Sequence, residues 1–144
     1  MDDSDPNNIR VADAKYIPLH LRDHLNADSA AAVYYKTIMY MYRFDTKVGF
    51  LFHPCSQEDA NNVKTNEELS HLKVENDTIT TSYQIEDREG CWLHEVGMII
   101  PQRSTTSALP SSSQMENDER FSKFKGDMTN VEASFVRIVE DFIK

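Results

Sequence analysis

The sequence predicts an α/β fold in which a central mixed β-sheet is flanked by helices. A short run with β character, residues 9–17, comes first, and a segment with helical periodicity follows over residues 28–44. A continuous apolar run over residues 48–52 then ends at Pro54, as is typical of a strand covered on both faces. A strand, a crossover helix and a second buried strand favour a right-handed parallel βαβ unit.

Length and composition indicate one domain over residues 1–144, large enough to bury a core without disulfides. Hydrophobic residues make up 40% of the chain and charged residues 27%. There is no apolar run of membrane-spanning length, and the acidic start, residues 1–5, is unlike a secretory signal. We therefore expect a cytoplasmic protein without a membrane partner. Cys55 and Cys91 form no C-x-x-C motif, which favours free thiols over a zinc site.

The helix predicted over residues 28–44 has Asp28 or Ser29 as a suitable N-cap. Its apolar stripe consists of Ala30, Tyr34, Ile38 and Met41. Lys36 and Arg43 stand seven residues apart, on roughly one side of the helix. They could line the same site as Lys15.

The second half of the chain is predicted to hold shorter strands and a final helix. In order, these are a short helix around residues 67–71, strands at 72–74 and 78–85, a strand at 91–100, a mobile loop at 102–118 and a terminal helix at 130–143. Asn76-Asp77 is a turn signal that favours a hairpin, and Pro101 ends the later strand. A serine run, residues 111–113, supports the loop.

The first strand carries a candidate site, because Asp13 and Lys15 are two residues apart and project from the same face as Val11. A carboxylate can hold Mg²⁺, and an adjacent ammonium can stabilise charge or help to activate water during phosphodiester cleavage. The triplet is short, and a surface ion pair is the alternative interpretation.

Four segments resemble, in order, the C-terminal part of a PD-(D/E)XK nuclease domain of the McrC-like and LlaJI-like restriction endonucleases. They are Asp13-Ala14-Lys15-Tyr16, Lys36-Thr37-Ile38-Met39-Tyr40, Gly49-Phe50-Leu51-Phe52-His53-Pro54 and Val96-Gly97-Met98-Ile99-Ile100-Pro101. The resemblance implies a restriction-endonuclease-like sheet that lacks its N-terminal helix and first strand. It also implies a Mg²⁺- or Mn²⁺-dependent endodeoxyribonuclease of a restriction or defence system.

By the same resemblance, Asp13 is an acidic metal ligand, the Ala14 carbonyl can also bind the metal, and Lys15 positions or activates the attacking water. Lys36 supports the site or contacts phosphate. The family's first acid stands on a preceding strand, for which Asp5 is the available substitute. The Asp expected three residues before Lys36 is replaced by Val33.

The expected partners are DNA and either a nucleotide-dependent restriction subunit or a missing N-terminal portion. The net charge of −9 opposes a general nucleic-acid surface. Residues 1–54 contribute six Lys or Arg against seven Asp or Glu, whereas residues 55–144 contribute nine against seventeen. A DNA-facing surface is therefore expected in the first third.

A second class of function stays open, in which the chain is a non-catalytic intracellular module that binds a protein partner. Docking of the terminal helix or pairing along a sheet edge would serve that role. The tyrosines of the first helix can belong to the core rim or form a base-stacking platform. His20 and His24 have helical spacing, but no nearby Glu completes a zinc-hydrolase motif.

Overall fold

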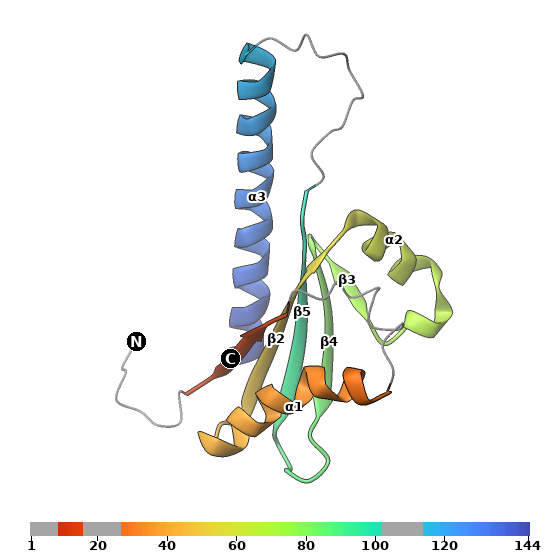
Figure 1. Ribbon diagram of the computed structural model, residues 1–144, viewed down its shortest axis with the longest axis vertical. Helices are drawn as coiled ribbons and strands as arrows, with labels where there is room; N and C mark the ends of the chain where they lie inside the picture. Colours follow the sequence, from red (N-terminus) through yellow and green to blue (C-terminus); the bar gives the residue numbers. More distant parts are fainter. Residues whose placement is uncertain (1–8, 16–26, 102–113) are drawn as a thin grey trace.

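The computed structural model describes residues 9–15, 27–101 and 114–144 and centres on a five-stranded mixed sheet (Figure 1). The strands are β1 (Val11–Ala14), β2 (Val48–Cys55), β3 (Lys73–Glu75), β4 (Thr78–Gln84) and β5 (Trp92–Ile99). They lie in the order β1-β2-β5-β4-β3, in which β1, β2 and β5 are parallel and β4 is antiparallel to both of its neighbours. The predicted α/β class with a mixed sheet is confirmed.

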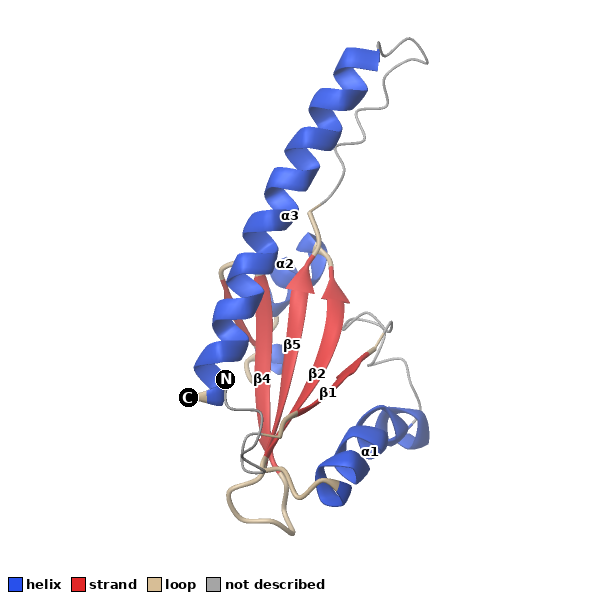
Figure 2. Cartoon of the chain, turned by 90° about the vertical axis from the view of Figure 1, so that its left-hand side faces the viewer, coloured by secondary structure: helices blue, strands red, loops and turns tan. Residues whose placement is uncertain are grey.

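Helices cover both faces of this sheet (Figure 2). They are α1 (Ala27–Arg43), α2 (Gln57–Thr65), the 3₁₀ helix η3 (Glu67–Leu69) and α3 (Gln114–Ile143). Successive residues of β2 point to opposite faces. Leu51 packs with Met41 of α1, and Cys55 packs with Ala60 of α2, whereas Phe50 packs with Ile138 of α3. Thus α1 and α2 share one face and α3 covers the other.

The predicted parallel pairing of the first two strands is confirmed, because β1 and β2 are parallel neighbours and α1 lies between them in the chain. Three members of the predicted stripe are confirmed: Met41 is fully buried, and Tyr34 and Ile38 pack against the same cluster. The side chain of Ala30, the fourth member, lies outside the described part of the structure. Gly49 lets α1 approach closely, since a Cβ there would overlap Met41 Sδ. In the described part of the chain, no helix combines the length and apolarity needed to cross a bilayer.

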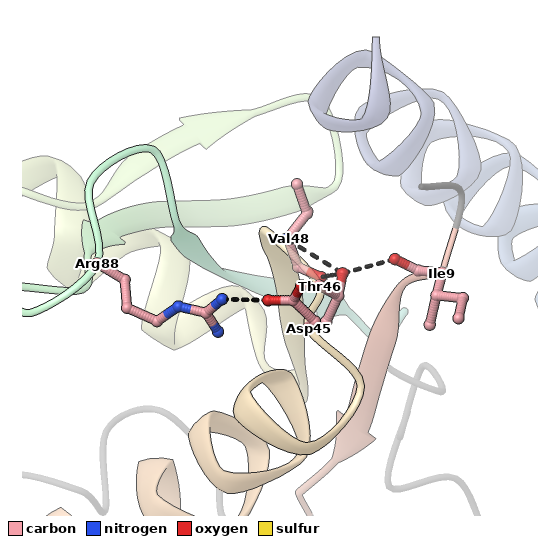
Figure 3. Close-up of polar contacts among 5 residues, drawn as sticks. All are labelled: Ile9, Asp45, Thr46, Val48 and Arg88. Atoms are coloured by element: carbon pink, nitrogen blue, oxygen red, sulfur yellow. Dashed lines mark hydrogen bonds and ion pairs between the residues drawn. The ribbon is translucent and has the colours of Figure 1, made fainter. Parts of the chain in front are cut away.

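The turn between α1 and β2 fixes the start of β1 (Figure 3). Buried Thr46 donates its hydroxyl hydrogen to the Ile9 carbonyl, at 2.5 Å between oxygens, and accepts from the Val48 N–H. Asp45 occupies the left-handed region of this turn with φ +50° and pairs with Arg88 of the β4–β5 loop. The start of the edge strand that carries Asp13 is therefore tied to the α1–β2 turn, which is itself joined to the β4–β5 loop.

Pro54 does not end β2, contrary to the prediction. Proline has no N–H to donate, but this loss affects hydrogen bonding to only one of the two strands beside β2. Lys15 N–H donates to the Phe52 carbonyl, whereas the Cys55 carbonyl accepts from Ile100. Hydrogen bonds of alternate residues point to opposite neighbours, so the Pro54 nitrogen faces β1 rather than β5. The β2–β5 ladder continues to Cys55, and the β1–β2 ladder ends at Lys15.

The later strands match the predictions in type, whereas the helices differ in number and in boundaries. The hairpin is confirmed, with Asn76 at φ +42° in its turn. Helix α2 was not predicted, although Ser56 and Asp59 form a capping box at its start. Helix α3 begins at Gln114, so residues 114–118 of the expected loop are helical; residues 102–113 lie outside the described residues.

Candidate functional site

The candidate site lies on the α1-facing side of β1. Asp13 Oδ2 and Lys15 Nζ are 2.7 Å apart, and their side chains are 19% and 18% exposed. The two side chains project together, as the strand alternation predicts. This partial burial distinguishes the pair from a fully solvated surface ion pair, because less water screens the interaction.

The neighbouring strands add a second polar pair to this face. Register places Asp13 beside Leu51, and Leu51 beside Glu95 of β5. His53 lies on the same face of β2, two residues after Leu51, and is next to Lys15. Its Nε2 lies 3.0 Å from Glu95 Oε1, and both side chains are buried. The site therefore continues inward from the partly exposed Asp13–Lys15 pair to a hydrogen-bonded pair that is shielded from water.

Tyr34 connects α1 to this buried pair. Its hydroxyl donates to Glu95 Oε2 at 3.4 Å, so both carboxylate oxygens of Glu95 have partners. The Tyr34 ring also packs edge-on against Tyr83 of β4, with centroids 5.9 Å apart. A buried carboxylate is costly unless it is hydrogen-bonded, and these contacts supply that compensation.

Asp13 and Glu95 do not form a two-carboxylate metal site. They are two strands apart, which corresponds to roughly 10 Å between backbones, and Leu51 stands between them. Within residues 9–15, 27–101 and 114–144, no group of three or more His, Cys, Asp or Glu is placed to hold a metal ion. A Mg²⁺ ion at this site would have to use Asp13 without Glu95.

The Ala14 carbonyl is a suitable second oxygen for such an ion. The Ala14 carbonyl and the Lys15 N–H belong to the same peptide group, and in a strand the two point in opposite directions. Because the Lys15 N–H bonds to β2, the Ala14 carbonyl points away from β2, toward the outer side of the strand. Among the described residues β1 is the edge strand, so no ladder uses that carbonyl. Mg²⁺ commonly takes one or two carboxylates and completes its shell with water and phosphate oxygens. Asp13 and Ala14 fit such a partial shell.

Lys36 does not contact the Asp13–Lys15 pair. Its exposed ammonium lies over the Tyr40 ring, 5.8 Å from the centroid. Tyr34 and Tyr42 of the same helix face Tyr83 and Arg88, on the β4 side. At about 100° per residue, Lys36 lies nearly opposite the buried Met41, so its side chain projects from the solvent-facing side of α1. Asp5, the other predicted ligand, lies outside the described residues.

A groove of about 190 Å³ lies beside Lys15, at the carboxyl ends of β1 and β2. Its lining is mostly apolar: Ala14, Lys15, Phe52, His53, Pro54, Met98 and Phe135. Phe135 comes from α3, so the groove is shared between the sheet and the terminal helix. Phe52 and Phe135 lie on the α3-covered face, opposite to the Asp13 side chain, so the groove meets the candidate site at Lys15 and His53.

The thiols do not supply a nucleophile to this site. Burial is the main cause that raises the pKa of Cys55 to about 12, and the nearby carboxylates of Asp59 and Glu95 contribute to the same increase. A thiol with this pKa is protonated at neutral pH, and the thiolate is the reactive form. Cys91 is buried as well. The prediction of free cysteines is confirmed.

Sequence reasoning missed His53, Glu95 and Tyr34 as a group. One signal was present: Glu95 is a lone carboxylate inside an apolar strand segment, where an ionised side chain requires a partner. The partner could not be read from the sequence, because His53 is 42 residues away and is brought close only by the β2–β5 register.

Comparisons of the chain with models of protein families, with curated proteins and with solved structures find no match. The geometry itself defines a mixed α/β domain with an Asp–Lys pair on an edge strand.

Proposed function

We propose that this chain is a nuclease-related domain that takes part in metal-dependent hydrolysis of DNA phosphodiesters, in a restriction or defence system. The observation that carries the proposal is the Asp13–Lys15 pair, held 2.7 Å apart on an edge strand with the Ala14 carbonyl turned outward. By the resemblance, these three groups would take three of the roles found in a PD-(D/E)XK nuclease. The restriction-endonuclease-like arrangement is part of this proposal.

Each group has a separate task. Asp13 and the Ala14 carbonyl would hold Mg²⁺ or Mn²⁺, which when bound polarises a phosphate oxygen and lowers the pKa of water. Lys15 would orient the attacking water through its ammonium and neutralise charge on the phosphate. Hydrolysis forms a bond from the water oxygen to phosphorus and breaks one ester P–O bond, and a proton passes to the leaving oxygen. Lys36 would contact a more distant phosphate from the exposed side of α1.

The pair alone binds cations weakly, because Lys15 neutralises Asp13 and competes with a metal for the same oxygen. A second carboxylate near Asp13 would offset the positive charge of Lys15 and strengthen cation binding. The edge of β1 is a suitable place for a strand that carries it, since edge strands present unpaired backbone groups. We propose that an upstream portion or a nucleotide-dependent restriction subunit supplies this acid.

Cleavage of supercoiled plasmid DNA in the presence of Mg²⁺ or Mn²⁺ tests the proposal. We expect nicking by the full chain, alone or with the upstream portion, and a loss of about 10²-fold or more in Asp13→Ala and Lys15→Ala. Lys73→Ala is the matched control, because Lys73 is exposed on β3 at the opposite edge of the sheet. Cleavage that both site variants leave intact would rule out the assignment.

DNA binding separates an inactive domain from a wrong proposal. Binding that weakens with salt and with Lys15→Ala or Lys36→Ala, but not with Lys73→Ala, supports a phosphate-contacting surface even without cleavage. If the chain neither cleaves nor binds DNA, the non-catalytic interaction module becomes the better explanation.

A further inference from the structure

Helix α3 is longer than the sheet that it covers, and its N-terminal half projects past the sheet (Figures 1 and 2). Its C-terminal half is buried against the sheet through Phe135 and Ile138, which pack with Phe50 and Val96. Projecting helices are marginal in water unless a packed apolar face supports them. The contacts between α3 and the sheet therefore do not explain why the projecting half is helical.

The apolar stripe of α3 does not stop where the sheet stops. Spacings of three and four residues alternate along the helix, through Phe121, Phe124, Met128, Val131, Phe135 and Ile138. These are the a and d positions of a seven-residue repeat, which is the seam of a coiled coil. Phe121 is 63% exposed, and Phe124 and Met128 are only half-buried. An exposed seam of this kind marks an interaction surface.

We propose that the projecting half of α3 pairs with the same half of a second copy of this chain, as an antiparallel two-helix coiled coil. Phe121 of each copy would pack in a layer with Phe124 of the other, which places four phenylalanine rings at the centre of the interface. The proposal concerns assembly and does not depend on the proposed nuclease activity.

The flanking charges favour this occupant and this direction. In an antiparallel pair, e positions face e positions and g positions face g positions. When the two helices are centred on the Phe121–Phe124 layers, Asp118 of one helix faces Lys125 of the other. Arg120 of one helix likewise faces Asp127 of the other. Each contact occurs twice by symmetry. All four pairs have opposite charges.

Other arrangements of the same two helices place like charges together. In a parallel pair, g faces the following e of the partner, which would set Arg120 against Lys125 and Asp127 against Glu132. An antiparallel register shifted by one heptad would place Lys125 against its own copy and Asp127 against its own copy. The charge pattern therefore selects one register and opposes the alternatives.

Sedimentation velocity over a series of concentrations, on the full chain, tests the proposal. We expect a monomer–dimer equilibrium that Lys125→Asp weakens by about tenfold or more, because two attractive pairs become repulsive. Asp118→Lys should weaken it similarly. The double variant Asp118→Lys/Lys125→Asp should restore dimerisation, because it exchanges the two charges.

Matched controls are available on the same helix. Lys123→Asp and Glu119→Lys make the same charge changes at exposed positions outside the seam and its flanks, so they should leave the equilibrium unchanged. Circular dichroism verifies that every variant is folded. A chain that stays monomeric at all concentrations would overturn the proposal, as would a double variant no tighter than the single ones, or equal effects from the control variants.

Discussion

At the scale of single residues, the two polar pairs of the site differ in how much water surrounds them. Asp13 and Lys15 keep about a fifth of their side-chain surface exposed, whereas His53 and Glu95 are 0% and 2% exposed. Partial exposure keeps the first pair in contact with solvent, although Asp13 Oδ2 itself is buried. Because His53 and Glu95 are shielded from water, they bond to each other, and this suits a structural role beneath the Asp13–Lys15 pair.

Removing one member of the buried pair should therefore be costly. We expect His53→Leu and Glu95→Leu each to lower the free energy of unfolding by about 3–5 kcal/mol, because each leaves the other member buried without this partner. The double variant His53→Leu/Glu95→Leu should lose less than either single variant, since it removes both polar groups together. Urea denaturation measures all three.

Tyr34→Phe is the control for this set. It removes one hydrogen bond to Glu95 but keeps the ring contact with Tyr83, so a loss of about 1 kcal/mol is expected. Strictly additive losses for the His53 and Glu95 variants would show that the two side chains do not act as a pair.

The sequence predicted the first pair but not the second, for a reason of chain geometry. Asp13 and Lys15 are close because a strand repeats every two residues, a rule that needs no tertiary information. His53 and Glu95 are close because β2 and β5 are aligned in one particular register. A shift of one residue in that alignment would point Glu95 to the opposite face.

At the scale of elements, the contact between β2 and β5 depends on the absence of a side chain at Gly97. Gly97 lies beside His53 in the register, and a Cβ there would overlap Cys55 Sγ. Both strands are central in the sheet, so neither can move away without disturbing a second ladder. The glycine is required by close packing, not by a turn.

Gly97→Ala should accordingly lower the free energy of unfolding by about 1–3 kcal/mol through overpacking. The double variant Cys55→Ala/Gly97→Ala removes the sulfur that the new methyl group would meet, and should recover part of this loss relative to Cys55→Ala alone. Thermal denaturation of the four proteins forms a double-mutant cycle. A coupling energy near zero would contradict the assigned contact.

Elements were predicted well wherever local signals agreed. The hairpin around Asn76 and the stripe of α1 follow from turn chemistry and helical spacing. Helix α2 was missed because most of its surface is polar, although the Ser56–Asp59 capping box marked its start. The first half of α3 was missed because its polar residues outweighed the seam begun by Phe121.

At the scale of the whole molecule, the attachment of α3 to the sheet brings together residues from three elements around His94. The His94 ring stacks on Phe142 of α3, with centroids 4.1 Å apart, and lies 5.5 Å from Phe50 of β2. Its Nδ1 is 2.7 Å from the Ser82 hydroxyl of β4. Burial in this aromatic layer lowers the pKa of His94. The docking of α3 is thereby linked to pH.

The sign of this link follows from proton binding. A histidine whose pKa is lower in the folded state contributes fully to stability above its unfolded pKa of about 6.5. As the pH falls below that value the unfolded state binds the proton first, so the free energy of unfolding decreases until the folded pKa is reached.

We expect the melting temperature to fall between pH 7.5 and 5.5, and to fall less in His94→Gln. His71→Gln is the control, because His71 is exposed and outside the aromatic layer. If His94→Gln keeps the full pH dependence of the parent chain, protonation of this ring does not control how α3 is held.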